Sequence, residues 1–296
     1  MRNGSSSANE TPRLQAFAER WNTITQSRGM QRIGAWTRIG VTIALVIFLA
    51  QRLDQIGWQA VIASLPTAPG FYAFLIAGYM TLPLCEWLIF RRLWSLPPRA
   101  LPVFFRKRVY NEAVIDHAGD AFLLTWANAH TSIAPRTLLI GVKDAAIVSA
   151  AVSHAATIVL AAAAFQTDFL GLLLPAAADQ RLAFVFGVAF LVAMLLILVA
   201  LRRKLLHSTA PLIRYIASLH TMRLLLVMAC DVAMWESAVP AMSWSGWLIV
   251  LAGQFLLTRL PFLPNKDLSF AALGVGLAGL LGEDAAALSG MFVAGA

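Results

Sequence analysis

The chain is poor in charged residues and contains only two cysteines. Charged residues make up 13% of its 296 residues, whereas hydrophobic residues make up 59%. A soluble domain carries about 25% charged residues, so the excess of apolar side chains is expected to face lipid. The sequence also lacks a long polar block that could fold as a separate soluble domain. The composition therefore predicts one membrane unit and excludes a water-soluble globular protein.

Motifs of catalysis and metal binding are missing as well. Cys85 and Cys230 each lie in an apolar run, without a CxxC partner or a histidine at zinc-ligand spacing. The sequence has no HExxH motif, no P-loop and no soluble ATPase domain. We therefore expect no metal and no cofactor, and the sequence favours a protein without catalytic activity of its own. Any transport would be passive, ion-coupled or driven by a partner.

Apolar runs divide the chain into segments that are expected to cross the bilayer as helices. A bilayer core about 30 Å thick needs about 20 apolar residues in a helix. We predict about seven crossings, over residues 35–50, 71–90, 145–165, 182–201, 222–242, 244–257 and 268–282. Shorter apolar segments are predicted to be re-entrant or interfacial, over residues 56–65, 109–129, 169–178 and 285–296. The expected fold class is all-α, a polytopic integral membrane helical bundle.

The basic residues indicate how the chain is oriented in the membrane. With seven crossings, all of the 23 Lys and Arg residues except Arg52 and Arg181 fall on one side of the bilayer. Loops rich in Lys and Arg stay in the cytoplasm, so the N-terminus is predicted to be cytoplasmic. The net charge of +8 then reflects topology, and no nucleic-acid partner is expected. Trp244 and Trp247 are expected at the outer membrane–water interface.

We divide the chain into a cytoplasmic tail over residues 1–34 and a single transmembrane domain over residues 35–296. Within the tail, apolar residues from Leu14 to Ile24 fall on one face of a predicted amphipathic helix. Such a helix either lies on the cytoplasmic leaflet, as an interfacial helix, or packs on the protein itself.

Three acidic residues fall within predicted spans, where a charge is costly and is often functional. Glu86 lies near the cytoplasmic end of its span, where it either belongs to a polar site or pairs with Arg91 or another neighbouring cation. Asp231 and Glu236 lie in the middle of one span and would be roughly 140° apart around a helix. Both could border a wide polar cavity. Alternatively, this helix does not span and is re-entrant.

Positive residues at the inner membrane surface form a further candidate site. Arg91 and Arg92 end the second predicted span, and Lys266 and Asp267 stand at the expected N-terminus of the last one. Arginine side chains and helix N-termini both favour phosphate groups. Together with the three intramembrane acids, these residues are candidates for binding a lipid headgroup, unless they only anchor the topology.

A second acidic group lies between the predicted spans. Glu112, Asp116 and Asp120 are spaced by four residues and would share one face of a helix. Carboxylates at this spacing could hold Mg²⁺ or meet a cationic headgroup. The alternative is a solvated face that pairs with the basic residues 106–108.

Two motifs and a long basic stretch between the spans point to a family. One motif is Glu86 to Trp94 (EWLIFRRLW), with arginines at the end of the second helix, and the other is Leu263 to Asp267 (LPNKD), which opens a final Gly-rich hairpin. Together they resemble the transmembrane region of lysylphosphatidylglycerol synthetases, which also occurs alone in small bacterial flippase-like proteins. The resemblance implies a multi-pass protein of the bacterial cytoplasmic (inner) membrane that handles a lipid.

We therefore expect a flippase-like membrane protein that binds or translocates a lipid or lipid-linked headgroup between leaflets. One alternative is a membrane-embedded lipid-modifying transferase, with Glu112, Asp116 or Asp231 as the base. Another is a structural subunit of an envelope-biosynthesis complex. The expected partners are membrane lipids, and possible further partners are other envelope-biosynthesis proteins or a second copy of the chain.

Overall fold

The computed structural model describes residues 28–113, 118–165, 178–259, 266–277 and 285–295, and these residues form helices and short connections without any strand. In chain order the helices are α2 (Arg28–Ile56), α3 (Trp58–Ala63), α4 (Pro69–Trp94), α5 (Leu101–Ala113), α6 (Ala118–His130), α7 (Pro135–Phe165), α9 (Ala178–Leu205), α10 (Ala210–Ala238), α11 (Trp244–Leu257), α12 (Lys266–Leu277) and α13 (Ala285–Gly295). Residues 1–27, with the expected amphipathic helix, and residues 169–177 of an expected interfacial segment lie outside the described residues. The all-α expectation is confirmed.

Four helices among the described residues are long and apolar enough to cross a membrane, namely α4, α7, α9 and α10. The shortest of them, α4, has 26 residues and is about 39 Å long at about 1.5 Å per residue. The expected seven crossings are not confirmed. The helix α11 has 14 residues, which is too short to cross alone. Of the expected span over 268–282, residues 268–277 lie in α12, and residues 278–282 lie outside the described residues.

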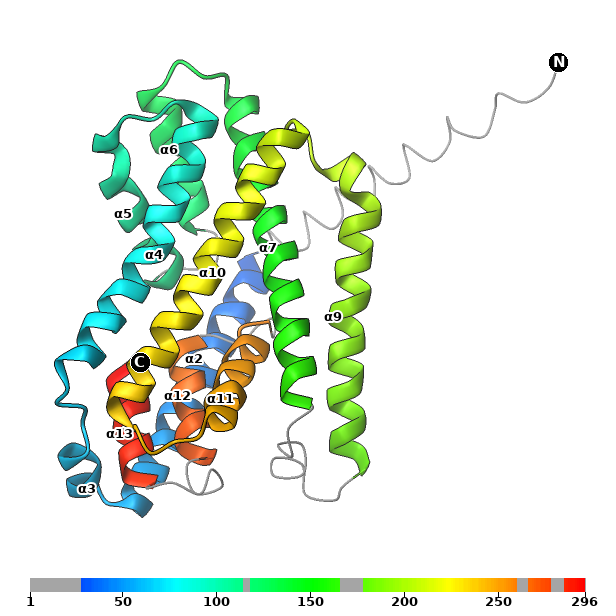
Figure 1. The fold of residues 1–296 in the computed structure, drawn as a ribbon. Helices are drawn as coiled ribbons and strands as arrows, with labels where there is room; N and C mark the ends of the chain where they lie inside the picture. The colour runs from blue at the N-terminus through cyan, green and yellow to red at the C-terminus, as the bar shows by residue number, and fades with distance from the viewer. Residues whose placement is uncertain (1–27, 114–117, 166–177, 260–265, 278–284, 296) are drawn as a thin grey trace.

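The centre of the bundle is the pair formed by α4 and α10, with α7 packed on α10 (Figure 1). The two helices of the pair approach closely where α4 has a glycine, since a Cβ atom added at Gly78 would lie 3.5 Å from Cβ of Cys230. The helix α9 packs against α7 at the side of the bundle and exposes large apolar side chains such as Phe186 and Leu196. Exposed apolar side chains of this kind are expected on a helix that faces lipid.

A helical cap closes one end of the bundle. It consists of α5 and α6, which pack on each other, with α5 also resting on α4 and α6 on α7. The backbones of α5 and α6 nearly touch at Gly119, where an added Cβ atom would lie 2.1 Å from the carbonyl oxygen of Lys107. Apolar side chains fill the space beneath it, including Ile89, Trp94, Phe104, Leu123 and Leu138. We call α5 and α6 the α5–α6 cap.

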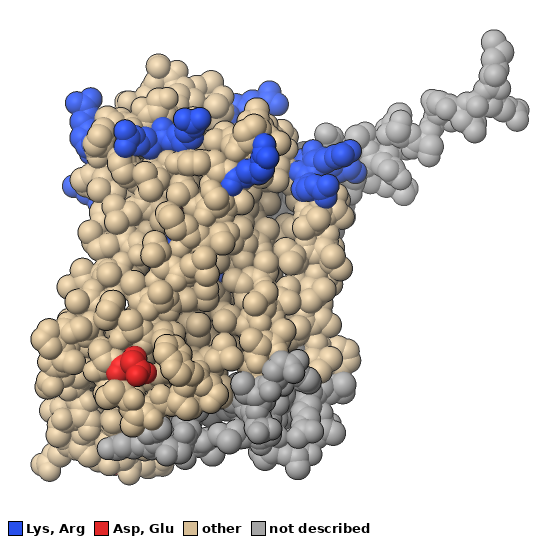
Figure 2. Space-filling view, viewed as in Figure 1, with Lys and Arg blue, Asp and Glu red and all other residues tan. Residues whose placement is uncertain are grey.

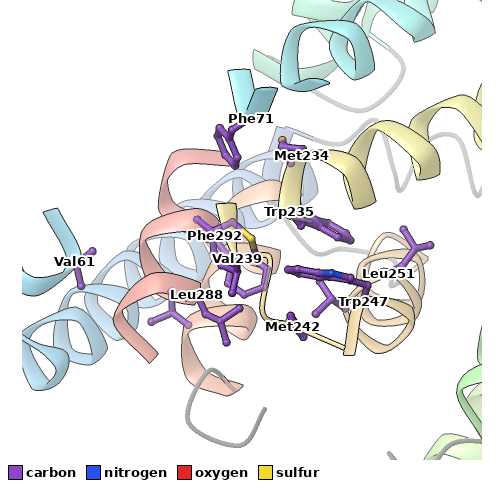
Figure 3. Close-up of a cluster of buried hydrophobic side chains, with 14 of the residues drawn as sticks. Val61, Phe71, Met234, Trp235, Val239, Met242, Trp247, Leu251, Leu288 and Phe292 are labelled. Atoms are coloured by element: carbon purple, nitrogen blue, oxygen red, sulfur yellow. The ribbon is translucent and has the colours of Figure 1, made fainter. Parts of the chain in front are cut away.

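The short helices α3, α11, α12 and α13 gather at the opposite end (Figure 1). Their core includes Trp235 and Trp247, whose rings stack with centroids 5.9 Å apart (Figure 3). The expectation that Trp244 and Trp247 both lie at the membrane–water interface is wrong for Trp247. Trp244 is 76% exposed, but Trp247 is 1% exposed. Trp247 is buried because its indole stacks on Trp235 and donates a hydrogen bond to Glu236.

Lys and Arg side chains gather at the end of the bundle that carries the α5–α6 cap (Figure 2). At this end α4 and α9 finish, and α7 and α10 begin. The side chains involved include Arg91, Arg92, Arg99, Arg106, Arg136, Arg202, Arg203, Lys204 and Arg214. We call this end the basic end.

Candidate functional site

Lys107 is the centre of a buried ion-pair cluster that joins α4, α5 and α6. Its side chain is 4% exposed, its ammonium group donates a hydrogen bond to Glu86 Oε1, and it lies 3.0 Å from Asp120 Oδ1. Burial by itself would lower the pKa of Lys107, but the two carboxylates outweigh burial and raise this pKa above its ordinary value. A charged lysine therefore ties the α5–α6 cap to the end of α4.

Pro83, inside α4, explains the position of Arg108, the residue of α5 that follows Lys107. Pro83 has no N–H group, so the carbonyl of Tyr79, four residues earlier, has no helical partner. Arg108 donates to that carbonyl through Nη1, and its guanidinium carbon lies 3.7 Å from the centre of the Tyr79 ring. The helix α4 continues through Pro83. The carbonyl that the proline leaves without a helical partner gives α5 a second attachment to α4.

Two polar residues of α10 face the same cluster. His220 and Arg223 are three positions apart, which places them on one side of the helix. His220 is 3% exposed, and the positive charges of Arg223 and Lys107 act on it. The guanidinium of Arg223 is attracted by Glu86 and repelled by Arg108. The cluster thus extends from the cap into the middle of α10.

Arg259 lies just after α11, and the positive charge of Arg223 acts on it. The Nε atoms of Arg223 and Arg259 are buried, and neither has a hydrogen-bond partner in the described part of the chain. The charged residues assembled in this way are four cations, Lys107, Arg108, Arg223 and Arg259, and two acids, Glu86 and Asp120. We call these six residues the charged cluster; its formal charge is four minus two, or +2.

A separate buried carboxylate connects α7 to the turn between α9 and α10. Asp144 is fully buried, and its Oδ2 atom accepts hydrogen bonds from the backbone N–H groups of His207 at 3.0 Å and Ser208 at 2.7 Å. Beside it, Lys143 Nζ donates to the carbonyl of Leu205 at 2.7 Å. These contacts satisfy backbone groups at the end of α9, so their role is structural.

The structure separates the three acids that were expected within spans. Glu86 pairs with Lys107, which agrees with the alternative that it binds another neighbouring cation. Asp231 faces α4, since its Oδ1 atom would lie 4.0 Å from a Cβ atom added at Gly78. Glu236 accepts a hydrogen bond of 2.6 Å from Trp247 Nε1. Asp231 and Glu236 therefore face different helices, α4 and α11.

The basic residues expected to converge on a phosphate also lie apart. Arg91 and Arg92 are exposed at the basic end, and the guanidinium of Arg91 lies 5.1 Å from the centre of the Trp87 ring. Lys266 and Asp267 occupy the first turn of α12, as the helix-start signal predicted, and the side chain of Asp267 lies outside the described residues. The helix α12 packs on α2, α11 and α13 in the lower half of Figure 1, away from the end of α4.

The three acids of the second group do not share one described helix. Glu112 belongs to α5 and Asp120 to α6, while Asp116 and the side chain of Glu112 lie outside the described residues. Asp120 is not on a solvated face, because its side chain is 20% exposed and pairs with the buried Lys107. In the described part of the chain no group of three or more His, Cys, Asp or Glu residues could hold a metal ion.

Sequence reasoning missed Arg223 and Asp144, and it treated Lys107 as solvated. A signal for Arg223 was present in Thr209-Ala210-Pro211, because proline favours the first turn of a helix. The helix α10 does begin at Ala210, so Arg223 falls in its middle and not in a loop. No local signal could have shown that Lys107 is buried, since burial there depends on α4 and α6.

Comparisons with protein-family models, with curated proteins and with solved structures found no match for this chain. The resemblance to the transmembrane region of lysylphosphatidylglycerol synthetases therefore stays a prediction.

Proposed function

We propose that this chain is a flippase-like membrane protein that binds a lipid or lipid-linked headgroup and moves it between leaflets. The observation that carries the proposal is the charged cluster, which extends from the α5–α6 cap to the middle of a helix long enough to cross the membrane. Charges away from water are costly unless they are paired, and among the described residues this cluster gathers four cations and two acids from several helices. Such a group is more expected in a protein that handles polar headgroups inside the bilayer than in a purely structural bundle.

The proposed topology places the basic end in the cytoplasm, because loops rich in Lys and Arg are retained there. The helices α2, α4, α7, α9 and α10 then cross the membrane, and the N-terminus is cytoplasmic. The helices α11 and α12 return to the same side whether they cross fully or form a re-entrant hairpin. We favour the hairpin, because α11 has only 14 residues and the positive charge of Arg223, in the middle of α10, acts on Arg259 just after α11. In a bacterium, the proposed location is the cytoplasmic membrane.

A possible route for the headgroup follows from the arrangement of the cluster. The ion pair of Lys107 with Glu86 and Asp120 holds the α5–α6 cap over the cytoplasmic end of the α4–α10 pair. A headgroup that passes between cap and bundle would exchange contacts with water for contacts with Arg108 and Arg223. Its acyl chains would stay in the bilayer, against the apolar side chains that the bundle exposes.

A reconstitution experiment tests the proposal. The full-length protein is inserted into vesicles that contain a trace of fluorescent phosphatidylglycerol, and dithionite then quenches the outer leaflet. Translocation predicts that the quenched fraction rises from about half of the label to nearly all of it, and that Arg223→Gln slows the rise. The control Arg203→Gln removes an exposed cation of α9 and should leave the rate unchanged. A quenched fraction equal to that of protein-free vesicles would refute translocation.

The same vesicles distinguish the transferase alternative. If the chain modifies a lipid, mass spectrometry of the extracted lipids should show a product of changed mass that Asp231→Asn abolishes. Unmodified lipids together with rapid quenching would support translocation alone.

A further inference from the structure

We infer that the side chains of Lys143 and His207 form a pH-sensitive link between α7 and the turn that joins α9 to α10. The link is closed while the His207 ring is neutral, and protonation of the ring makes Lys143 change its hydrogen-bond partner. This property goes beyond the proposed function and does not depend on it. It adds a response to pH to the structural contacts that Lys143 and Asp144 make with the turn.

The geometry around one ring nitrogen of His207 is the first argument. Its Nδ1 atom lies 2.8 Å from Lys143 Nζ and 3.1 Å from the carbonyl oxygen of Leu205. A ring nitrogen accepts a hydrogen bond from an ammonium group only when it carries no hydrogen, and it donates to a carbonyl only when it carries one. The two contacts therefore exclude each other as hydrogen bonds. At the shorter distance Nδ1 is the acceptor, so the neutral ring carries its hydrogen on Nε2.

The partners of Lys143 are the second argument. Its ammonium group donates to the Leu205 carbonyl at 2.7 Å and lies 3.4 Å from Asp144 Oδ1. That carboxylate oxygen is buried and has no hydrogen-bond partner in the described part of the chain. The ammonium group of Lys143 therefore has a further acceptor close by, in its own helix, with which it makes no hydrogen bond.

Protonation of His207 exchanges these partners. The hydrogen added to Nδ1 removes one acceptor of Lys143 and places two positive charges side by side. The Nδ1–H group then donates to the Leu205 carbonyl, and the ammonium group of Lys143 moves to Asp144 Oδ1. The hydrogen bonds that joined α7 to the end of α9 are replaced by one within the turn and one within α7. Asp144 Oδ2 keeps its hydrogen bonds from the backbone N–H groups of His207 and Ser208.

The charges around the turn leave Lys143 as the group that responds. The His207 side chain is exposed, so it takes up protons from the solvent, and histidine ordinarily changes its charge between about pH 5 and pH 8. Among the described residues, Lys143 is the cation within hydrogen-bond distance of the ring, and Asp144 is the acid that contacts the turn. The other charged side chains that α4, α7, α9 and α10 bring to this end are all cations, namely Arg91, Arg92, Arg136, Arg202, Arg203, Lys204 and Arg214.

NMR of isotope-labelled histidine rings tests the position of the hydrogen directly. The full-length protein, purified in detergent, contains five histidines, and the signal that disappears in His207→Phe belongs to His207. We expect Nδ1 of His207 to carry no hydrogen at about pH 8 and to carry one at about pH 5. A hydrogen on Nδ1 at the higher pH would show that the neutral ring donates to Leu205 and does not accept from Lys143, which would overturn the inference.

Thermal melting at the same two pH values measures the link itself. Lys143→Met should lower the melting temperature at the higher pH, because the bonds to His207 and Leu205 are lost. At the lower pH the loss should be at most about half as large, since Lys143 is then repelled by the ring and bonds within α7. In the His207→Phe background, Lys143→Met should have the same effect at both pH values. The control Lys204→Met removes an exposed cation of α9 and should have the same small effect at both.

The remaining outcomes separate a pH-sensitive link from a purely structural one. An equal loss from Lys143→Met at both pH values, in the wild-type background, would assign Lys143 a structural role alone and overturn the inference. A pH dependence that persists in the His207→Phe background would assign the response to another group, such as Asp144, and would overturn it as well. If Lys143→Met does not fold, the position of the hydrogen on Nδ1 in the wild type decides.

Discussion

Replacing Lys107 by methionine should destabilise the protein strongly. The substitution Lys107→Met keeps a long flexible side chain but removes the ammonium group that pairs with Glu86 and Asp120. Removing one partner of a buried ion pair costs about 3–5 kcal/mol, because the other charge stays buried without compensation. Here two carboxylates lose the ammonium group, but their side chains keep 16% and 20% exposure. We therefore expect a loss of about 3 kcal/mol.

The assay is equilibrium unfolding of the purified protein in mixed micelles with increasing dodecyl sulfate, followed by far-UV circular dichroism. Glu86→Gln combined with Lys107→Met should recover about half of the loss, since one of the two carboxylates that lost the ammonium group is then neutral. The control Lys204→Met removes an exposed cation at the same end of the bundle and should change stability by less than about 0.5 kcal/mol. If Lys107→Met were as mild as the control, the cluster would not hold the cap and our reasoning would be refuted.

The pH dependence of this contribution follows from the raised pKa of Lys107. A lysine whose pKa is higher in the folded state contributes stability that is fully present below its unfolded pKa of about 10.4. That contribution is lost only as the pH rises through the higher, folded value. The difference in stability between the wild type and Lys107→Met should therefore stay constant from about pH 7 to pH 9. A difference that shrinks within this range would contradict a charged, paired lysine.

Three further predictions concern the cap, the opposite end and the topology. Gly119→Ala should destabilise the protein by about 2 kcal/mol or more in a thermal melt, because the new Cβ atom would lie 2.1 Å from a carbonyl oxygen of α5. The control Gly187→Ala places its Cβ atom where no atom lies within 4 Å, so it should be neutral or slightly stabilising. Trp247→Phe should lower stability in dodecyl sulfate by about 1–3 kcal/mol, since it leaves a partly buried carboxylate without its indole donor. A reporter fused near Arg99 should be active in the cytoplasm and one near Asp54 outside; the reverse pattern would overturn the topology.

The elements that the sequence predicted correctly are those that depend on local composition. The apolar runs around α4, α7 and α9 correspond to long helices of the structure, because backbone groups in lipid must be satisfied within the helix itself. The boundary of α10 was predicted twelve residues too late, at 222 in place of Ala210, because a helix can begin with a polar turn before its apolar run, as the proline at its first turn indicates.

The candidate site was predictable only in part. Glu86 was identified as a candidate site residue because an acid within an apolar run is unusual in any context. Pairing of Glu86 with a neighbouring cation was one of the predicted alternatives. Its partner Lys107 stood within a run of three basic residues, and nothing in that run distinguishes a buried lysine from its exposed neighbour Arg106. The burial of Lys107 depends on how closely α6 approaches α5 at Gly119.

The sequence by itself determined that the protein is helical, that it is apolar enough for a membrane and that its basic residues are unevenly distributed. These properties depend on side-chain hydrophobicity and on backbone hydrogen bonds within each segment, so they can be read one segment at a time. Only the tertiary structure decided which charges meet. Glu86, Lys107 and Asp120 belong to three different helices, and their ion pairs depend on the way α5 and α6 pack on each other and on α4. Contacts of this kind depend on packing between helices, which composition and spacing leave open.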